Sequence, residues 1–317
     1  MDSQKTFSKD VSATGNQPLV AWLVLAGLVL TWGSSFILMK RALVYYSSIE
    51  VGALRVIITF LFLLPFALPR LKTLKPKDFL WLSLVGLVGS FFPAFLFAAA
   101  QKGIDSSTAG LLNSLTPLFT LIIGLLVFRI KVRKIQVIGV FIGLLGALGL
   151  VSSSGGRDFS FNISYALMVV LATIFYAINV NLIKAKLSHI KSITITATSF
   201  FIVGFPAIVI LFTATDFSQK LINEPGAWVG LGYLAILAIV GTGIAMMGFN
   251  MLIKKTTPIF ASSVTYLIPV VALLWGLLDG EYFDPGFLIW ITLIIAGVLL
   301  VNKTQTNKAK RGRKQVV

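Results

Sequence analysis

The feature that most constrains this chain is a series of long stretches without any charged side chain. Nine such stretches of 18 to 29 residues lie between residues 19 and 302, and a tenth, at 51–68, is interrupted by Arg55 alone. A helix of about 20 apolar residues crosses the hydrocarbon core of a bilayer. Only 12% of the residues are charged, whereas a soluble domain has about 25%. The sequence therefore predicts an all-α membrane protein with ten transmembrane helices.

Positive charge is distributed unevenly between alternate loops. The net charge is +16, and 21 of the 27 Lys and Arg residues fall on one side of the expected bundle. Because cytoplasmic loops are enriched in Lys and Arg, this bias predicts cytoplasmic N- and C-termini. The charge then reflects topology, and we expect no nucleic acid among the partners. The expected partners are a small-molecule substrate and the lipid bilayer.

The chain also contains an internal repeat. Residues 78–128 match residues 230–280 at a constant offset of 152, with 12 of 51 positions identical. These identities include Gly89 with Gly241, Phe97 with Phe249, Lys102 with Lys254 and Pro117 with Pro269. A weaker match, at an offset of 144, aligns WGSSFILMK, which ends at Lys40, with YAINVNLIK, which ends at Lys184. Each unit has five spans, an odd number, so the second enters the membrane from the opposite face.

The repeat predicts two inverted five-helix halves, an architecture of many secondary transporters with the substrate site between the halves. We expect the first repeat at residues 19–151, an external linker at 152–158 and the second repeat at 159–302. Cytoplasmic tails are expected at 1–18 and 303–317. The spans expected to line the pathway are the first, third and fourth of each half.

Four segments resemble a known family: LTWGSSFILMKRAL, GALRVIITFLFLLPFAL, LLNSLTPLFTLIIGLLVF and SSVTYLIPVVALLWGLLDGE. Over about residues 20–302 the chain resembles the EamA family of the drug/metabolite transporter superfamily. The resemblance implies export or exchange of amino acids, nucleotide precursors, sugars or other small metabolites by a multi-pass protein of the bacterial inner (cell) membrane. Members carry a Glu after the fourth and ninth spans. Glu281 matches the second of these positions, whereas Arg129 stands at the first.

Polar residues inside the spans are the candidate site, since an amide or a charge facing lipid is costly. The residues expected to bind substrate are Trp32, Ser35, Arg55, Asn113, Thr116, Asn179, Asn250, Thr265 and Tyr266. Pro117 and Pro269 are expected to kink their helices and to free backbone carbonyls for gating or binding. The alternative is structural: Arg55 anchors its helix, and the hydroxyl and amide groups join neighbouring helices.

Two further patterns concern helix packing and helix ends. Gly139, Gly143, Gly146 and Gly149 form a stripe of small residues suited to close packing or to a homodimer. We expect the fifth and tenth spans to be peripheral. The paired lysines Lys40 with Lys184 and Lys102 with Lys254 close their helices, where a cation complements the terminal carbonyls.

Several chemistries are excluded by what the sequence lacks. It contains no Cys and no phosphate-binding loop of the GxxxxGK[ST] type, and its only histidine is His189. No Asp or Glu lies deep in any span, which argues against an embedded hydrolase and against obligatory proton coupling. We expect no enzyme activity, no cofactor and no metal. The sequence favours a secondary transporter, an exporter or exchanger, that moves a small polar, most simply amino-acid-like, metabolite by alternating access. The alternatives are a non-transporting scaffold or receptor subunit, and a transporter of anionic or nucleotide-type metabolites.

Overall fold

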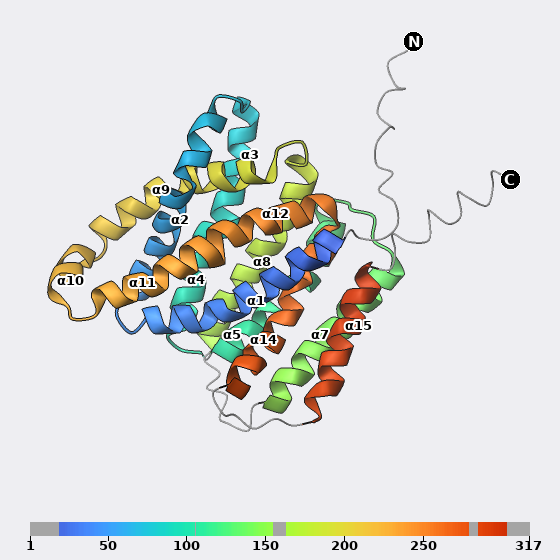
Figure 1. Cartoon of the computed structure of the whole chain (residues 1–317). Helices are drawn as coiled ribbons and strands as arrows, with labels where there is room; N and C mark the ends of the chain where they lie inside the picture. The colour runs from blue at the N-terminus through green and yellow to red at the C-terminus, as the bar shows by residue number, and fades with distance from the viewer. Residues whose placement is uncertain (1–18, 105, 155–162, 279–284, 303–317) are drawn as a thin grey trace, which may run out of the picture.

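A computed structural model describes residues 19–104, 106–154, 163–278 and 285–302, and every regular element in these ranges is a helix (Figure 1). The first half contains α1 (Leu19–Ala42), α2 (Ser48–Leu71), α3 (Pro76–Gly86), η1 (Leu87–Phe91), α4 (Phe92–Ala100), α5 (Ser106–Asn113), α6 (Thr116–Leu126) and α7 (Lys134–Ser154). The second half contains α8 (Ile163–Lys186), α9 (Ser192–Thr213), α10 (Phe217–Asn223), α11 (Ala227–Ala238), η2 (Ile239–Ile244), α12 (Ala245–Lys255), α13 (Pro258–Ser262), α14 (Val264–Leu278) and α15 (Phe287–Asn302).

Many of these helices are long and apolar enough to cross a membrane. Six reach full length: Leu19–Ala42, Ser48–Leu71, Pro76–Ala100, Ile163–Lys186, Ser192–Thr213 and Ala227–Lys255. Four shorter apolar segments accompany them: Thr116–Leu126, Lys134–Gly149, Pro258–Val271 and Leu288–Val301. The arrangement of ten spans with cytoplasmic termini stays a prediction. The expected tails and residues 155–158 of the expected linker lie outside the described residues, and α7 continues to Ser154.

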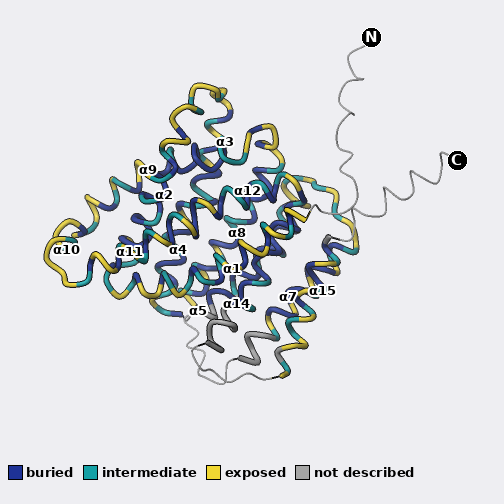
Figure 2. Tube along the Cα trace, viewed as in Figure 1, coloured by how far each residue is buried: buried dark blue, intermediate teal, exposed yellow. Residues whose placement is uncertain are grey.

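The outer surface of the bundle is apolar. Leu19, Leu126 and Trp228 are 72%, 76% and 68% exposed. Figure 2 shows exposed positions along the outer sides of the helices and buried positions on their inner sides. Water would disfavour so much exposed apolar surface, whereas lipid tails accept it. The chain is therefore a multi-pass membrane protein.

Local sequence signals set several helix ends. At the start of α2, Glu50 N donates to Ser47 Oγ over 3.3 Å and Ser47 N donates to the Glu50 carboxylate over 2.6 Å, which is a capping box. Pro76 opens α3, where a missing N–H costs nothing. Thr257 caps α13 by accepting from Phe260 N over 3.1 Å.

The two halves share the same irregularities at matched positions. The rod from α3 to α4 contains the π-helical segment η1, and the rod from α11 to α12 contains η2, which begins 152 residues later. The fourth span is broken between α5 and α6, and the ninth is broken between α13 and α14. Single π-helical turns commonly mark functional sites. The repeat predicted from sequence identity therefore extends to the backbone.

Helices α7 and α15 lie side by side at one edge of the bundle (Figure 1). A Cβ at Gly139 would lie 2.9 Å from the Gly297 carbonyl oxygen, and one at Gly146 would lie 2.8 Å from Ile294 N. Gly149 packs in the same way against Trp290. The glycine stripe thus serves close packing within the chain, and a homodimer stays a prediction. The fifth and tenth spans are peripheral, as expected.

Candidate functional site: a cavity between the two halves

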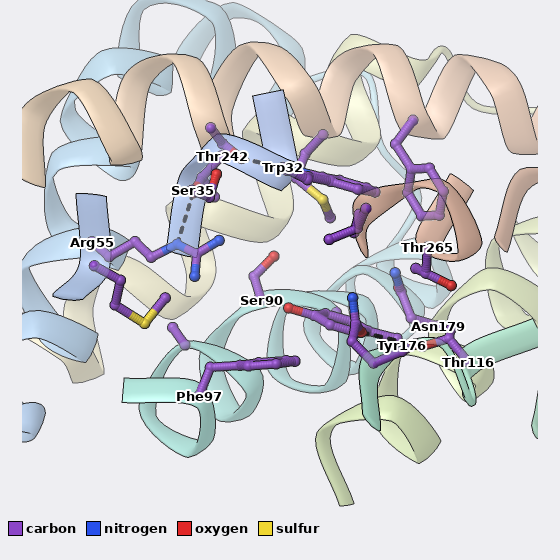
Figure 3. A pocket seen from close by; sticks show the side chains of 18 of the residues that line it. Trp32, Ser35, Arg55, Ser90, Phe97, Thr116, Tyr176, Asn179, Thr242 and Thr265 are labelled. Atoms are coloured by element: carbon purple, nitrogen blue, oxygen red, sulfur yellow. Dashed lines mark hydrogen bonds between the residues drawn. The ribbon is translucent and has the colours of Figure 1, made fainter. Parts of the chain in front are cut away.

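A cavity lies between the two halves, lined by both π-helical segments and by both broken helices (Figure 3). It encloses about 890 Å³ of space between atoms, including its opening. Its walls are mostly apolar and contain no Asp or Glu among the described residues. The described part of the wall therefore offers no carboxylate for proton transfer.

Most of the predicted site residues line this cavity. They are Trp32, Ser35, Arg55, Asn113, Thr116, Asn179 and Thr265. They come from α1, α2, the two broken helices and α8. The sequence argument relied on the cost of placing polar groups in lipid, and the structure places these groups together on the inside.

Two predicted site residues lie elsewhere. Tyr266 is fully buried, and its hydroxyl donates to the Val140 carbonyl over 2.8 Å, with its ring against Gly143. Asn250 is buried between α12 and α9, where its amide donates to the Thr196 hydroxyl over 2.9 Å. Both side chains point away from lipid, but each finds its partner on a neighbouring helix rather than in the cavity. The structure places both outside the cavity lining, and their part in substrate binding stays a prediction.

Pro117 and Pro269 shape the cavity without lining it. A proline cannot donate to the carbonyl four residues earlier, which here belongs to Asn113 and Thr265. The Thr116 hydroxyl donates to the Asn113 carbonyl over 2.7 Å, and the Ser114 hydroxyl donates to the Thr265 carbonyl over 3.2 Å. Hydroxyl groups therefore satisfy both freed carbonyls, and Asn113 and Thr265 are held at the cavity wall.

The π-helical segments bring two glycines against polar side chains of the opposite half. A Cβ at Gly89 in η1 would lie 2.6 Å from the Asn179 amide, and one at Gly241 in η2 would lie 2.9 Å from the Ser35 hydroxyl. Ser35 and Asn179 are equivalent at the 144-residue offset. Trp32 Nε1 also donates to the Gly241 carbonyl over 2.9 Å. Each glycine thus permits a close approach that orients a cavity side chain.

Arg55 enters the cavity from α2. Its Nε donates to the Thr242 hydroxyl of η2 over 2.8 Å (Figure 3), and that hydroxyl donates to the Leu237 carbonyl over 3.1 Å. Glu50, one and a half turns earlier, is 1% exposed and pairs instead with Lys220 over 2.9 Å. Arg55 is therefore a cavity residue and does not reach the helix end.

Several cavity residues were missed by sequence reasoning. They include Ser90, Phe97, Tyr176, Phe200, Thr242 and Phe249. Helix α2 also lines the cavity, through Arg55 and Val56, and α9 lines it through Phe200. The second and seventh spans therefore line the cavity in addition to the six spans that were expected to do so. The repeat could have indicated some of them. Phe97 and Phe249 are identical at equivalent positions, and Tyr176 aligns with the predicted site residue Trp32.

Two lysines join neighbouring helices at one end of the bundle, which we call the Lys184 end. Lys184 Nζ on α8 donates to the carbonyls of Ile253, Lys254 and Thr256 over 3.2, 2.9 and 2.6 Å. Lys254 Nζ donates in turn to the Ile190 carbonyl. The expected capping of terminal carbonyls is present, but Lys184 caps α12 rather than its own helix.

The equivalent lysines at the opposite end, the Lys40 end, are free. Lys40 and Lys102 are exposed, and neither makes a hydrogen bond within the described ranges. Helices α8 and α12 pack together near the Lys184 end, whereas their equivalents α1 and α4 hardly touch. Gly103, beside Lys102, lies against Tyr165 at the start of α8, which places Lys102 and Lys184 at opposite ends of that helix.

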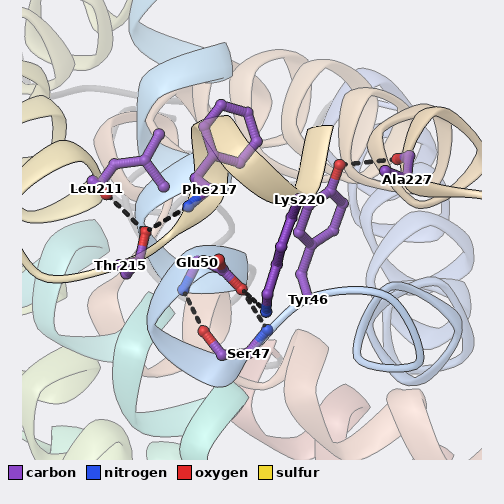
Figure 4. Close-up of polar contacts among 8 residues, drawn as sticks. All are labelled: Tyr46, Ser47, Glu50, Leu211, Thr215, Phe217, Lys220 and Ala227. Atoms are coloured by element: carbon purple, nitrogen blue, oxygen red, sulfur yellow. Dashed lines mark hydrogen bonds and ion pairs between the residues drawn. The ribbon is translucent and has the colours of Figure 1, made fainter. Parts of the chain in front are cut away.

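At the Lys40 end, polar contacts join the loop between α1 and α2 to the second half (Figure 4). Lys220 reaches Glu50, and the Tyr46 hydroxyl donates to the Ala227 carbonyl over 2.7 Å. Burial raises the pKa of Tyr46, and the charges of Glu50 and Glu224 raise it further. At the Lys184 end, His189 Nε2 lies 3.2 Å from the Asp78 carboxylate. In the described part of the chain, no cluster of three His, Cys, Asp or Glu residues could hold a metal.

The sequence model of the EamA-like transporter family matches residues 19–152 and 163–303, one match for each half of this bundle. The chain belongs to the EamA-like transporter family. It is therefore a transporter and not an enzyme. The two matched ranges agree with the two units of the internal repeat, and residues of both ranges line the cavity.

Related proteins are named as transporters. The chain is 28% identical to the uncharacterized inner membrane transporter YedA of Escherichia coli, covering 87% of this chain and 89% of that protein. It is 29% identical to an uncharacterized transporter of Archaeoglobus fulgidus, with 88% and 98% covered. A probable amino-acid metabolite efflux pump of Salmonella typhimurium is 26% identical, with 86% and 91% covered. A solved crystal structure aligns with this chain at a TM-score of 0.66 and 19% sequence identity. The alignment covers 92% of this chain and 98% of the solved chain, so the two share a fold.

Proposed function

We propose that this protein is a secondary transporter of the inner membrane that exports or exchanges a small, amino-acid-like metabolite by alternating access. The observation that carries the proposal is the contrast between the two ends of one cavity. Lys184 and Lys254 tie α8 and α12 together at one end, while Lys40 and Lys102 are exposed at the other. Inverted repeats that close one end at a time give access to each side in turn.

The cavity lining supports a polar metabolite without obligatory proton coupling. Amide, hydroxyl and guanidinium groups of the predicted site face a mostly apolar wall that includes aromatic rings, and no described lining residue is an Asp or Glu. The relative from Salmonella typhimurium is named a probable amino-acid metabolite efflux pump, and the one from Escherichia coli is named an inner membrane transporter. The first name supports the proposed substrate class, and the second supports the proposed location.

The test is counterflow in proteoliposomes. Vesicles loaded with pooled unlabelled amino acids, nucleosides or organic acids would receive the matching labelled pool, with and without an imposed pH gradient. We expect counterflow of the amino-acid pool, unaffected by the gradient and strongly reduced in Asn179→Ala. Asn223→Ala, the same change at an exposed position of α10, is the matched control. Counterflow of no pool by well-folded protein would refute the proposal and favour a scaffold.

A further inference from the structure

We propose that Arg55 is the receptor for a single carboxylate of the substrate, so that the transported class is monocarboxylates with an apolar body. This inference rests on the proposed transport function. The inference adds the recognised chemical group, the residue that binds this group and the number of anionic groups that the cavity accepts.

Arg55 is a cation whose charge is not balanced by the protein. Only its Nε has a partner, the Thr242 hydroxyl at 2.8 Å, and in the described part of the chain its other guanidinium N–H groups donate to no protein atom. A charge removed from water is costly unless it is paired. The fork of a guanidinium binds a carboxylate through two parallel hydrogen bonds. The missing partner therefore has the chemistry of a carboxylate.

Among the described residues that line the cavity, only one half contributes such a cation. In the second half, Ser199 occupies the position equivalent to Arg55 at the 144-residue offset. The next residue in each half, Val56 and Phe200, lines the cavity, so the two positions are equivalent in space as well. The Ser199 hydroxyl donates to the Leu82 carbonyl over 3.0 Å, so it is engaged with the backbone. A dianion would leave its second charge without a cation. One carboxylate per substrate is what this asymmetry accommodates.

A second polar group of the substrate has a partner in Asn179. This side chain is 1% exposed and lines the cavity (Figure 3), and neither its amide nitrogen nor its amide oxygen has a hydrogen-bond partner among the described residues. Buried amides are normally satisfied, and each group left unpaired costs about 1–3 kcal/mol. Asn179 offers one acceptor and two donors, which suit an ammonium, a hydroxyl or an amide of the substrate.

Aromatic rings provide the surface for the rest of the substrate. Trp32 and Phe249 meet edge to face with ring centroids 4.9 Å apart, and Phe97 stacks on Tyr176 at 6.0 Å. All four rings line the cavity. An apolar body bound against these rings would leave its carboxylate to Arg55 and its second polar group to Asn179.

The experiment measures thermal stabilisation of the purified full chain by two matched pools, the protein amino acids and their carboxamides, at equal concentrations. We expect the acids to raise the unfolding midpoint and the amides to leave it unchanged. In Arg55→Gln the apparent affinity for the acid pool should fall about tenfold or more, because a charge-assisted pair is lost. Arg55→Lys keeps the charge and should retain part of the preference. Arg41→Gln removes an exposed arginine and should change nothing.

Equal stabilisation of the wild type by amides and acids would overturn the inference, and this comparison requires no variant to fold. An unchanged preference for acids in Arg55→Gln would overturn it as well. Stabilisation by neither pool would also overturn it. In that case counterflow of nucleosides or of another class without a carboxylate would still show a transporter, but not one of amino-acid-like metabolites, whereas an absence of all counterflow would remove transport as well.

Discussion

The two ends of the bundle are built from equivalent helices but are held differently. At each end, the loop between the first two helices of one half contacts the third helix of the other half. At the Lys40 end Tyr46 contacts Ala227 of α11, and at the Lys184 end His189 contacts Asp78 of α3. Among the described residues, lysines also bridge the two helices beside the cavity only at the Lys184 end. The scaffold is thus common to both ends, and the lysine bridge is the part that differs.

This comparison explains why the paired lysines occur at symmetry-related helix ends. A lysine can satisfy several terminal carbonyls of a neighbouring helix when the two helices converge, and it is solvated when they separate. For Lys40, the carbonyls equivalent to those bound by Lys184 belong to Gln101, Lys102 and Ile104. A chain that alternates between two states would form each bridge in turn.

The largest expected effect comes from removing the bridge with Lys184→Met. The chain has no cysteine, so Ser35→Cys in the cavity would serve as the only thiol, probed with an impermeant maleimide in inside-out and right-side-out vesicles. We expect labelling from the Lys184 side to rise about tenfold or more, since even one hydrogen bond from a charged group contributes about 1.5–3 kcal/mol. Lys255→Met, at an exposed neighbouring position, is the control. Equal labelling in both variants would show that the bridge does not hold this end closed.

A smaller effect is expected from Gly89→Ala, which compares the two π-helical segments. The new Cβ would lie 2.6 Å from the Asn179 amide, a side chain that can rotate away, so the protein should fold while the amide leaves its place in the cavity. We expect counterflow to fall about fivefold, the equivalent of about one hydrogen bond, with the unfolding midpoint nearly unchanged.

The partner variant Gly241→Ala sharpens the same comparison. It displaces the Ser35 hydroxyl, at 2.9 Å, and presses on Leu237 Cδ1, at 3.3 Å. The Ser35 hydroxyl already bonds its own helix at Thr31 and Leu237 is apolar, so the effect on counterflow should be smaller. Gly232→Ala, where a Cβ meets nothing within 4 Å, controls for the substitution itself. A larger loss in Gly241→Ala than in Gly89→Ala would mean that Ser35, and not Asn179, is the more important polar group.

How much of this could be predicted from the sequence depends on what each signal reports. Stretches without charge indicate the length of each span, and the 152-residue repeat indicates which spans of the two halves are equivalent. Together they predicted the all-helical fold and the place of the cavity between the two halves. The π-helical segments did not follow, because a π-turn is a backbone register change without a residue signature. Its trace in the repeat was two adjacent identities, Val88 with Val240 and Gly89 with Gly241.

For the site, the cost of polar groups in lipid predicts which side chains face inward but not what they meet. Asn113 and Asn179 reach the cavity, whereas Tyr266 reaches a carbonyl of α7 and Asn250 reaches Thr196. The difference lies in which helix packs beside each residue, which periodicity does not report. Arg55 shows the same limit, since its partner Thr242 lies 187 residues away.

The smallest expected effect concerns Tyr46, which holds the Lys40 end without crossing the cavity. Tyr46→Phe removes the hydrogen bond to the Ala227 carbonyl and should lower the free energy of unfolding by about 1 kcal/mol. The raised pKa means that the folded protein holds the phenolic proton more tightly than the unfolded chain. This contribution is therefore complete below about pH 10, the value for the unfolded chain, and is lost as the pH rises toward the folded pKa.

Thermal unfolding in detergent at pH 8 and above pH 10 measures both parts of this prediction. The advantage of the wild type over Tyr46→Phe should be present at the lower pH and should shrink at the higher one. Tyr45→Phe is the matched control, because the Tyr45 hydroxyl makes no hydrogen bond within the described residues. An advantage that stays constant over this range would show that Tyr46 contributes through its ring alone, in its contact with Phe217 at 5.9 Å between centroids. The Lys40 end would then be held chiefly by the ion pair of Glu50 with Lys220.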